Sequence, residues 1–236
     1  MNVIFDVDDT IYNLMEPFQR THEEMYAHRT DADCEQLFRA SREYSDEAFY
    51  MEERGELTAE EAFYYRIQKT YADVGIEVSR EEAKFFQQRY RYYQKHIHVP
   101  QAIKEVLTYC KENGITMGTL TNGKKENQGQ KIATLDLRRW FKEESLLISG
   151  GLGYSKPDPK AFEAVEKELG LEKEATWFVG DAFDMDVIGA KKAGWHVIWF
   201  NHRHRAMPKC DISPDIEVDT PEALLEAIKK IAEANS

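Results

Sequence analysis

The chain has 236 residues, and its 31 basic and 43 acidic side chains give a formal net charge of −12. An acidic chain without a basic stripe is not expected to bind nucleic acid or an anionic membrane surface. Its 42% of hydrophobic residues suffices for a folded core, and no apolar run reaches the roughly 20 residues of a membrane span. No secretory signal is visible, and three widely spaced cysteines favour free thiols in a reducing compartment. We therefore expect a soluble, cytoplasmic protein.

The chain begins with an apolar run at residues 2–5, which predicts a buried strand that ends before Asp6. Residues 14–98 change to long charged stretches with apolar side chains at every third or fourth position, which predicts amphipathic helices. Two capping boxes, which begin at Thr58 and at Ser79, mark the starts of two of these helices. We expect a domain of roughly four helices over this stretch.

After Pro100 the pattern alternates between helix and strand. Alternation of this kind predicts a parallel sheet with helices on both faces. The expected fold class is therefore α/β, a doubly wound parallel sheet built from residues 1–13 and 99–236, into which the helical domain of residues 14–98 is inserted. Beyond the first strand, the predicted strands are residues 115–120, 146–149, 176–179 and 196–200.

Polar side chains follow the predicted strands at the edge where open α/β sheets bind their ligands. Carboxylates crowded at one edge repel each other unless a cation lies among them, and Mg²⁺ prefers carboxylate and phosphate oxygens. A hydroxyl and an ammonium group could hold the remaining phosphate oxygens. The residues alone therefore indicate metal-assisted phosphoryl transfer. The polar residues are Asp6, Asp8 and Thr10 after the first strand, Thr121, Asn122 and Gly123 after the second, Lys156 after the third, and Asp181, Asp184 and Asp186 after the fourth.

These four segments resemble the motifs of the haloacid dehalogenase-like hydrolase superfamily, in its phosphatase branch, which includes nucleotidases and phosphoglycolate phosphatases. The family pattern is Asp-x-Asp-x-Thr, then Thr or Ser, then Lys, then Gly-Asp-x-x-x-x-Asp, and all four motifs occur here in that order. The helical insert resembles the C1-type cap of the family. Asp8 favours phosphate over halide chemistry, because the dehalogenases of the family lack this second aspartate.

The resemblance implies a role for each motif residue. Asp6 would be the nucleophile that forms an aspartyl-phosphate, and Asp8 would protonate the leaving oxygen and then activate water. Mg²⁺ would be the cofactor, bound by the carboxylates of Asp6 and Asp181 and by the backbone carbonyl of Asp8. Asp186 would support the metal site, while Asp184 is interpreted as a helix cap. Thr121 and Lys156 would bind the phosphoryl group, and Thr10, Asn122 and Gly123 would contribute to substrate binding.

The expected function is hydrolysis of a small phosphorylated metabolite. Nucleoside 5′-monophosphates are favoured slightly, because Trp199 and Asn201 resemble the end of a strand in some nucleotidase-like relatives. A sugar-phosphate phosphomutase of the same family and a receiver-like phospho-acceptor regulator are the alternatives. The second aspartate and the helical insert count against the regulator. The basic stretch at residues 202–205 is interpreted as a solvated surface loop.

Overall fold

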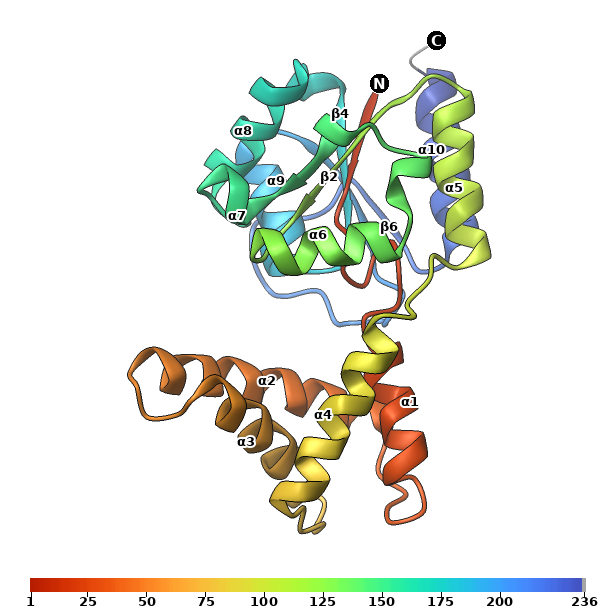
Figure 1. The fold of residues 1–236 in the computed structure, drawn as a ribbon. Coiled ribbons are helices and arrows are strands. Elements are labelled where there is room, and N and C mark those ends of the chain that lie inside the picture. Colours follow the sequence, from red (N-terminus) through yellow and green to blue (C-terminus); the bar gives the residue numbers. More distant parts are fainter. Residues whose placement is uncertain (235–236) are drawn as a thin grey trace. The chain divides into compact units, whose positions relative to one another are not determined.

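The computed structural model describes residues 1–234, which form two compact units (Figure 1). The first, the α/β unit, consists of Met1–Asn13 and the chain from His98 onward. The second, the helical unit, consists of Leu14–Ile97. Each unit has a hydrophobic core of its own.

Within residues 1–234, the α/β unit contains one six-stranded sheet in the order β3-β2-β1-β4-β5-β6. All neighbouring strands are parallel, so the predicted doubly wound α/β fold is confirmed. The edge strand β6 was not predicted, because three residues are too few to show an alternating pattern. The strands are β1 (Asn2–Phe5), β2 (Thr116–Thr121), β3 (Leu146–Ile148), β4 (Thr176–Gly180), β5 (His196–Phe200) and β6 (Ile216–Val218).

Helices cover both faces of this sheet (Figure 1). Helices α5 and α10 pack against each other on one side, and α8 and α9 lie together on the other. Helix α6 was not predicted, because only Gln128 and Ile132 of its ten residues are buried and the apolar stripe is missing. The helices are α5 (Gln101–Glu112), α6 (Lys125–Thr134), α7 (Ser149–Leu152), α8 (Pro159–Leu169), α9 (Ile188–Ala193) and α10 (Pro221–Ala234).

Strand β1 lies in the middle of the sheet, between β2 and β4. Its last residue, Phe5, pairs in register with Thr119 of β2 and with Val179 of β4. The carboxyl ends of these three strands therefore meet at one edge. Below that edge, Phe162 and Trp195 pack edge to face in the core, with ring centroids 5.4 Å apart, and each buried aromatic ring contributes about 1.5–3 kcal/mol to stability.

The helical unit is built from α1 (Glu16–Met25), α2 (Cys34–Glu53), α3 (Ala59–Ala72) and α4 (Arg80–Gln94). Both predicted capping boxes are confirmed: Thr58 with Glu61 begins α3, and Ser79 with Glu82 begins α4. Aromatic side chains fill the core of this unit, including Tyr26 and Tyr71 with ring centroids 4.2 Å apart. In the described part of the chain, no helix combines the length and the hydropathy that a membrane span needs.

Candidate functional site

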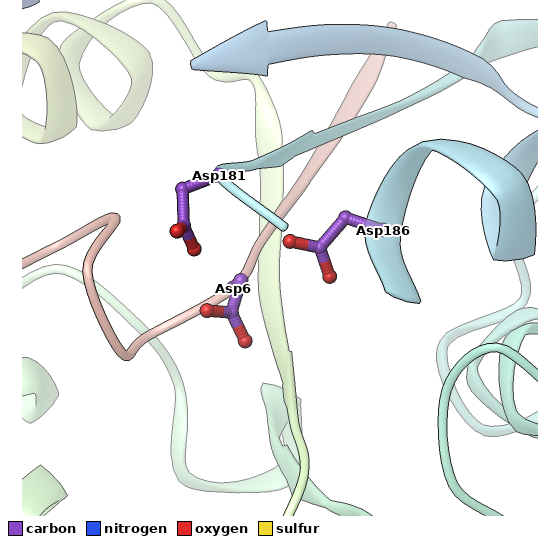
Figure 2. A group of neighbouring side chains, drawn as sticks. All are labelled: Asp6, Asp181 and Asp186. Atoms are coloured by element: carbon purple, nitrogen blue, oxygen red, sulfur yellow. The ribbon is translucent and has the colours of Figure 1, made fainter. Parts of the chain in front are cut away.

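Three aspartates at the carboxyl ends of the central strands direct their carboxylates toward a common space (Figure 2). Asp6 follows β1, Asp181 follows β4, and Asp186 lies in a π-helical turn over Phe183–Val187. All three are buried, and one carboxylate oxygen of each lies within 4.8 Å of the others. Asp184, in the same turn as Asp186, is exposed and does not belong to this cluster. These buried carboxylates form the acidic cluster.

A buried lysine compensates part of this negative charge. The Nζ atom of Lys156 lies 2.6 Å from Oδ1 of Asp6 and 2.7 Å from Oδ1 of Asp186. Burial lowers the pKa of Lys156, but the two carboxylates raise it more, so the ammonium group stays charged. Asn122 fixes the backbone of Lys156 in both directions: its Nδ2 donates to the carbonyl oxygen at 2.8 Å, and its Oδ1 accepts from the amide at 2.9 Å.

The acidic cluster carries more negative charge than Lys156 and Arg205, which donates to Asp181, can balance. Burial raises the pKa of Asp6 to about 7, although Lys156 opposes this shift. Burial and three neighbouring carboxylates raise the pKa of Asp181 well above its usual value. A bound divalent cation would remove this repulsion, and buried carboxylate oxygens are the donors that hard cations prefer. The residues therefore fit a hard divalent metal ion.

Asp186 is held rigidly by the segment that precedes it. Its Oδ1 accepts from Lys156, and its Oδ2 accepts from the backbone amide of Ala182 at 2.9 Å. A Cβ atom added to Gly180 would lie 2.3 Å from that Oδ2. Only glycine at this position leaves room for the carboxylate, which explains the glycine of the Gly-Asp motif in terms of packing.

Asp8 has a different environment and its own lysine. Both of its carboxylate oxygens accept hydrogen bonds from Nζ of Lys131, at 2.6 and 2.7 Å. Tyr12 donates its hydroxyl to Oδ1 at 2.6 Å, and Gln128 donates its side-chain amide to Oδ2 at 2.9 Å. Burial raises the pKa of Asp8, but Lys131 and these hydrogen bonds lower it more, so the net shift is downward. Sequence reasoning missed Gln128 and Lys131, and their spacing of three residues on one helix face was the only available signal.

Two threonines of the predicted site have hydroxyl groups without a partner. Within residues 1–234, Oγ1 of Thr10 and Oγ1 of Thr121 are enclosed and make no hydrogen bond. Because buried polar atoms are normally satisfied, these hydroxyls are suited to bind an oxygen-rich ligand. Gly123, by contrast, is exposed, and its amide donates to Oγ of Ser149 at 3.0 Å.

The interpretation of the basic stretch after β5 as a solvated loop is wrong for His202 and Arg203, whereas His204 and Arg205 are exposed as expected. Arg203 donates two hydrogen bonds to the buried carboxylate of Asp9, with Nη2 2.6 Å from Oδ1. The ring of His202 lies 2.9 Å from the carbonyl oxygen of Asp9, and Arg205 donates to Oδ2 of Asp181 at 2.9 Å. These residues follow a strand at the same edge of the sheet as the predicted site. Because open α/β sheets bind their ligands at this edge, the same reasoning could have predicted them.

The sequence model of the haloacid dehalogenase-like hydrolases matches residues 1–194. Among curated proteins, the chain is 33% identical to a glyceraldehyde 3-phosphate phosphatase of Methanopyrus kandleri over 53% of this chain and 54% of that protein. It is 34% identical to a phosphoserine phosphatase of Thermus thermophilus over 60% of this chain and 54% of that protein. The chain thus spans about half the length of the curated relatives it matches.

Solved structures share the fold over nearly the whole chain. The HAD-hydrolase YfnB of Bacillus subtilis, solved with bound magnesium, is 20% identical with a TM-score of 0.68, over 96% of this chain and 97% of that chain. A dehalogenase solved with an intermediate complex is 19% identical with a TM-score of 0.75, over 96% of both chains.

Proposed function

Because the chain belongs to the haloacid dehalogenase-like hydrolase family, we propose that it is a metal-dependent phosphatase for small phosphomonoesters. The observation that carries the proposal is the pair of aspartates after β1. Asp6 lies in the acidic cluster, whereas Asp8 lies outside it and is bound by Lys131. One carboxylate can therefore attack phosphorus while the other transfers protons. The phosphatase names of several relatives support the same class.

In the proposed reaction, a carboxylate oxygen of Asp6 attacks phosphorus and the bond to the leaving oxygen breaks. Asp8 gives its proton to that leaving oxygen from its protonated form, which the lowered pKa makes the minor form in the free protein. The Asp8 carboxylate then takes a proton from a water molecule, whose oxygen attacks the aspartyl-phosphate, releases inorganic phosphate and restores Asp6. Lys156, 2.6 Å from Asp6, and the unpartnered hydroxyl of Thr121 would stabilise the charge on the phosphoryl oxygens.

Mg²⁺ is the proposed cofactor. Asp6 and Asp181 would hold it through their carboxylates and Asp8 through its backbone carbonyl, with Asp186 in support. When bound, the ion supplies positive charge that keeps Asp6 ionised and offsets the negative charge of the phosphoryl oxygens. The raised pKa values of Asp6 and Asp181 support this assignment, because they reflect carboxylates that lack sufficient compensating charge.

The proposed substrate is a small phosphorylated metabolite. Trp199 is fully buried and its Nε1 donates to the carbonyl oxygen of Asp181 at 2.8 Å, so this side chain does not itself bind a base. A nucleoside 5′-monophosphate remains a candidate, because one relative is named a pyrimidine 5′-nucleotidase. Asn201 uses its side chain to bind Arg205 and Glu217. The names of two relatives, a glyceraldehyde 3-phosphate phosphatase and a phosphoserine phosphatase, make three-carbon phosphates the first compounds to test.

We also propose that the helical unit acts as the cap domain that selects the substrate. It is inserted directly after the segment that carries Asp6 and Asp8, and it has an aromatic core of its own. A separately folded insert can vary in sequence without disturbing the acidic cluster, which suits a role in specificity.

Phosphate release from a panel of phosphorylated metabolites, with Mg²⁺ or with EDTA, tests the proposed function. We expect Mg²⁺-dependent release that Asp6→Asn reduces by about 10³-fold or more. Asp184→Asn is the matched control, because Asp184 is exposed, and we expect activity within a factor of about two of the wild type. Full activity of Asp6→Asn would overturn the mechanism. Transfer of phosphate to a sugar phosphate instead of water would identify a phosphomutase.

A further inference from the structure

Arg66, in α3 of the helical unit, is a buried arginine with 7% of its surface exposed. Some arginines of this unit pair with acids near the surface, for example Arg29 with Glu82 at 2.9 Å and Arg89 with Glu24 at 2.8 Å. Arg66 has no such partner. Across residues 1–234, no carboxylate forms an ion pair with it.

The guanidinium group of Arg66 also lacks hydrogen-bond acceptors. Its Nη2 donates one long bond, 3.3 Å, to Oε1 of Gln87, and its Nε is enclosed without any partner in the described part of the chain. Aromatic rings cover its faces, with Cζ 5.1 Å from the centroid of Tyr90 and 5.9 Å from that of Phe63. Such rings attract a cation through their faces, but they offer no acceptor to N–H groups in the plane of the guanidinium.

The surroundings disfavour the positive charge of this arginine. Burial lowers the pKa of Arg66, Tyr90 raises it and Arg42 lowers it again, so a second cation lies close by. A buried charge without a counter-charge is strongly destabilising, which is why buried charges are normally paired. The chain has 43 acidic residues, yet none of those described is paired with this site. A negatively charged ligand would supply the counter-charge and the hydrogen-bond acceptors that Arg66 lacks.

We propose that Arg66 anchors an oxyanion-binding site in the helical unit. The ligand is a small molecule that carries a carboxylate or a phosphate group, because both present oxygens that match the two parallel N–H donors of a guanidinium. Phe63 and Tyr90 would hold the guanidinium group through cation–π contacts, and its N–H groups would donate to the ligand. This site goes beyond the acidic cluster and the phosphatase proposal, and its binding can be measured without turnover.

The binding test follows the side-chain Nε–H signals of the full-length protein by ¹H–¹⁵N NMR. Malonate and inorganic phosphate serve as probes, with chloride at equal ionic strength as the reference. We expect the Arg66 signal, assigned from its absence in Arg66→Lys, to shift saturably with either probe. The signal of Arg89, which Glu24 already neutralises, is the matched internal control and should not follow the same curve. A response of Arg66 to the probes no larger than to chloride would overturn the proposal.

A kinetic test identifies the source of the anion. Of the two tests, only this one rests on the proposed phosphatase function. It compares phosphoglycolate with ethylene glycol phosphate, which lacks the carboxylate. If the anion belongs to the substrate, Arg66→Lys should raise KM for phosphoglycolate about tenfold and leave that of the analogue unchanged. Unchanged KM values together with the NMR shift would assign the site to a separate small anion. Equal losses for both compounds would indicate a general structural role and overturn the proposal. If no compound of the panel is hydrolysed, the phosphatase proposal fails, while the NMR result still decides the Arg66 site.

Discussion

The pair formed by Asp6 and Lys156 differs from the pair formed by Asp8 and Lys131 in burial and in the charge around it. The first pair is nearly enclosed, with side chains 8% and 3% exposed, whereas those of the second are 23% and 22% exposed. Lys156 is also shared with Asp186, while both carboxylate oxygens of Asp8 bind the same lysine.

The pKa values of the two carboxylates shift in opposite directions. Burial outweighs pairing at Asp6 and raises its pKa to about 7. Lys131 and the hydrogen bonds outweigh burial at Asp8 and lower its pKa. Two aspartates separated by one residue thus acquire opposite properties. Asp6 gains from a bound cation, whereas Asp8 is already held as a carboxylate by Lys131 and its hydrogen bonds. The number of compensating groups around each carboxylate, rather than the presence of a lysine, decides the direction of its pKa shift.

Replacing Lys156 by Met should give the largest effect, because it removes the only lysine that binds Asp6 and Asp186 within the described residues. Breaking a buried ion pair by removing one partner costs about 3–5 kcal/mol, so we expect that loss in the free energy of unfolding, measured with urea, and a loss of phosphatase activity. The matched control is Lys191→Met, whose pair with Asp215 is 29% and 28% exposed and should cost about 1 kcal/mol or less. Equal losses in the two variants would contradict the proposed importance of burial.

The two aspartates should impose opposite pH dependences on the stability of the protein in EDTA. Because the pKa of Asp6 is about 7 in the folded protein and about 3.9 when unfolded, the folded state binds the proton more tightly between these values. The contribution of Asp6 to stability should therefore fall as pH rises from about 4 to 7, by at most about 1.4 kcal/mol for each pH unit. Asp8, with its lowered pKa, should instead lose its contribution as pH falls.

Urea unfolding at several pH values separates the two contributions. Asp6→Asn should flatten the slope between pH 4 and 7, and it should be more stable than the wild type at pH 8 in EDTA, although inactive. Mg²⁺ should restore stability to the wild type but not to this variant, because binding to the folded state is stabilising. An equal slope between pH 4 and 7 for the wild type and Asp6→Asn in EDTA would contradict the raised pKa of Asp6.

The sequence identified the residues that follow strongly apolar strands. Asp6, Asp181 and Asp186 come together as carboxylates, because the ends of β1 and β4 meet at one edge of a parallel sheet. Residues on segments without a periodic pattern of apolar side chains were not predicted. Lys131 belongs to a helix without an apolar stripe, so the rotation that turns it toward Asp8 could not be inferred. Arg203 reaches Asp9 from a loop whose path depends on tertiary contacts.

Arg203→Lys tests a third acid–base pair at this edge of the sheet. We expect its loss of stability to be smaller than that of Lys156→Met and larger than that of Lys131→Met. Arg203 forms two hydrogen bonds with Asp9, and the two side chains are 9% and 4% exposed. Lysine keeps the charge but cannot form both bonds, so we expect a loss of about 1.5–3 kcal/mol in the free energy of unfolding. Arg138→Lys is the control, because Arg138 binds Glu143 in the same manner on the surface. A larger loss in the control would show that burial does not determine the strength of these pairs.

Lys131→Met should have the smallest effect on stability and the clearest effect on proton transfer. The partly exposed pair is worth about 1 kcal/mol or less, and Asp8 keeps its hydrogen bonds from Tyr12 and Gln128. Because Lys131 is the main group that lowers the pKa of Asp8, its removal should raise that pKa. Asp8 must be protonated to act as the acid, so the alkaline limb of the pH profile of kcat/KM should move to higher pH. Lys125→Met, an exposed change on the same helix, should leave the profile in place. An alkaline limb that stays fixed in Lys131→Met would mean that a group other than Asp8 donates the proton, even if Asp6 remains the nucleophile.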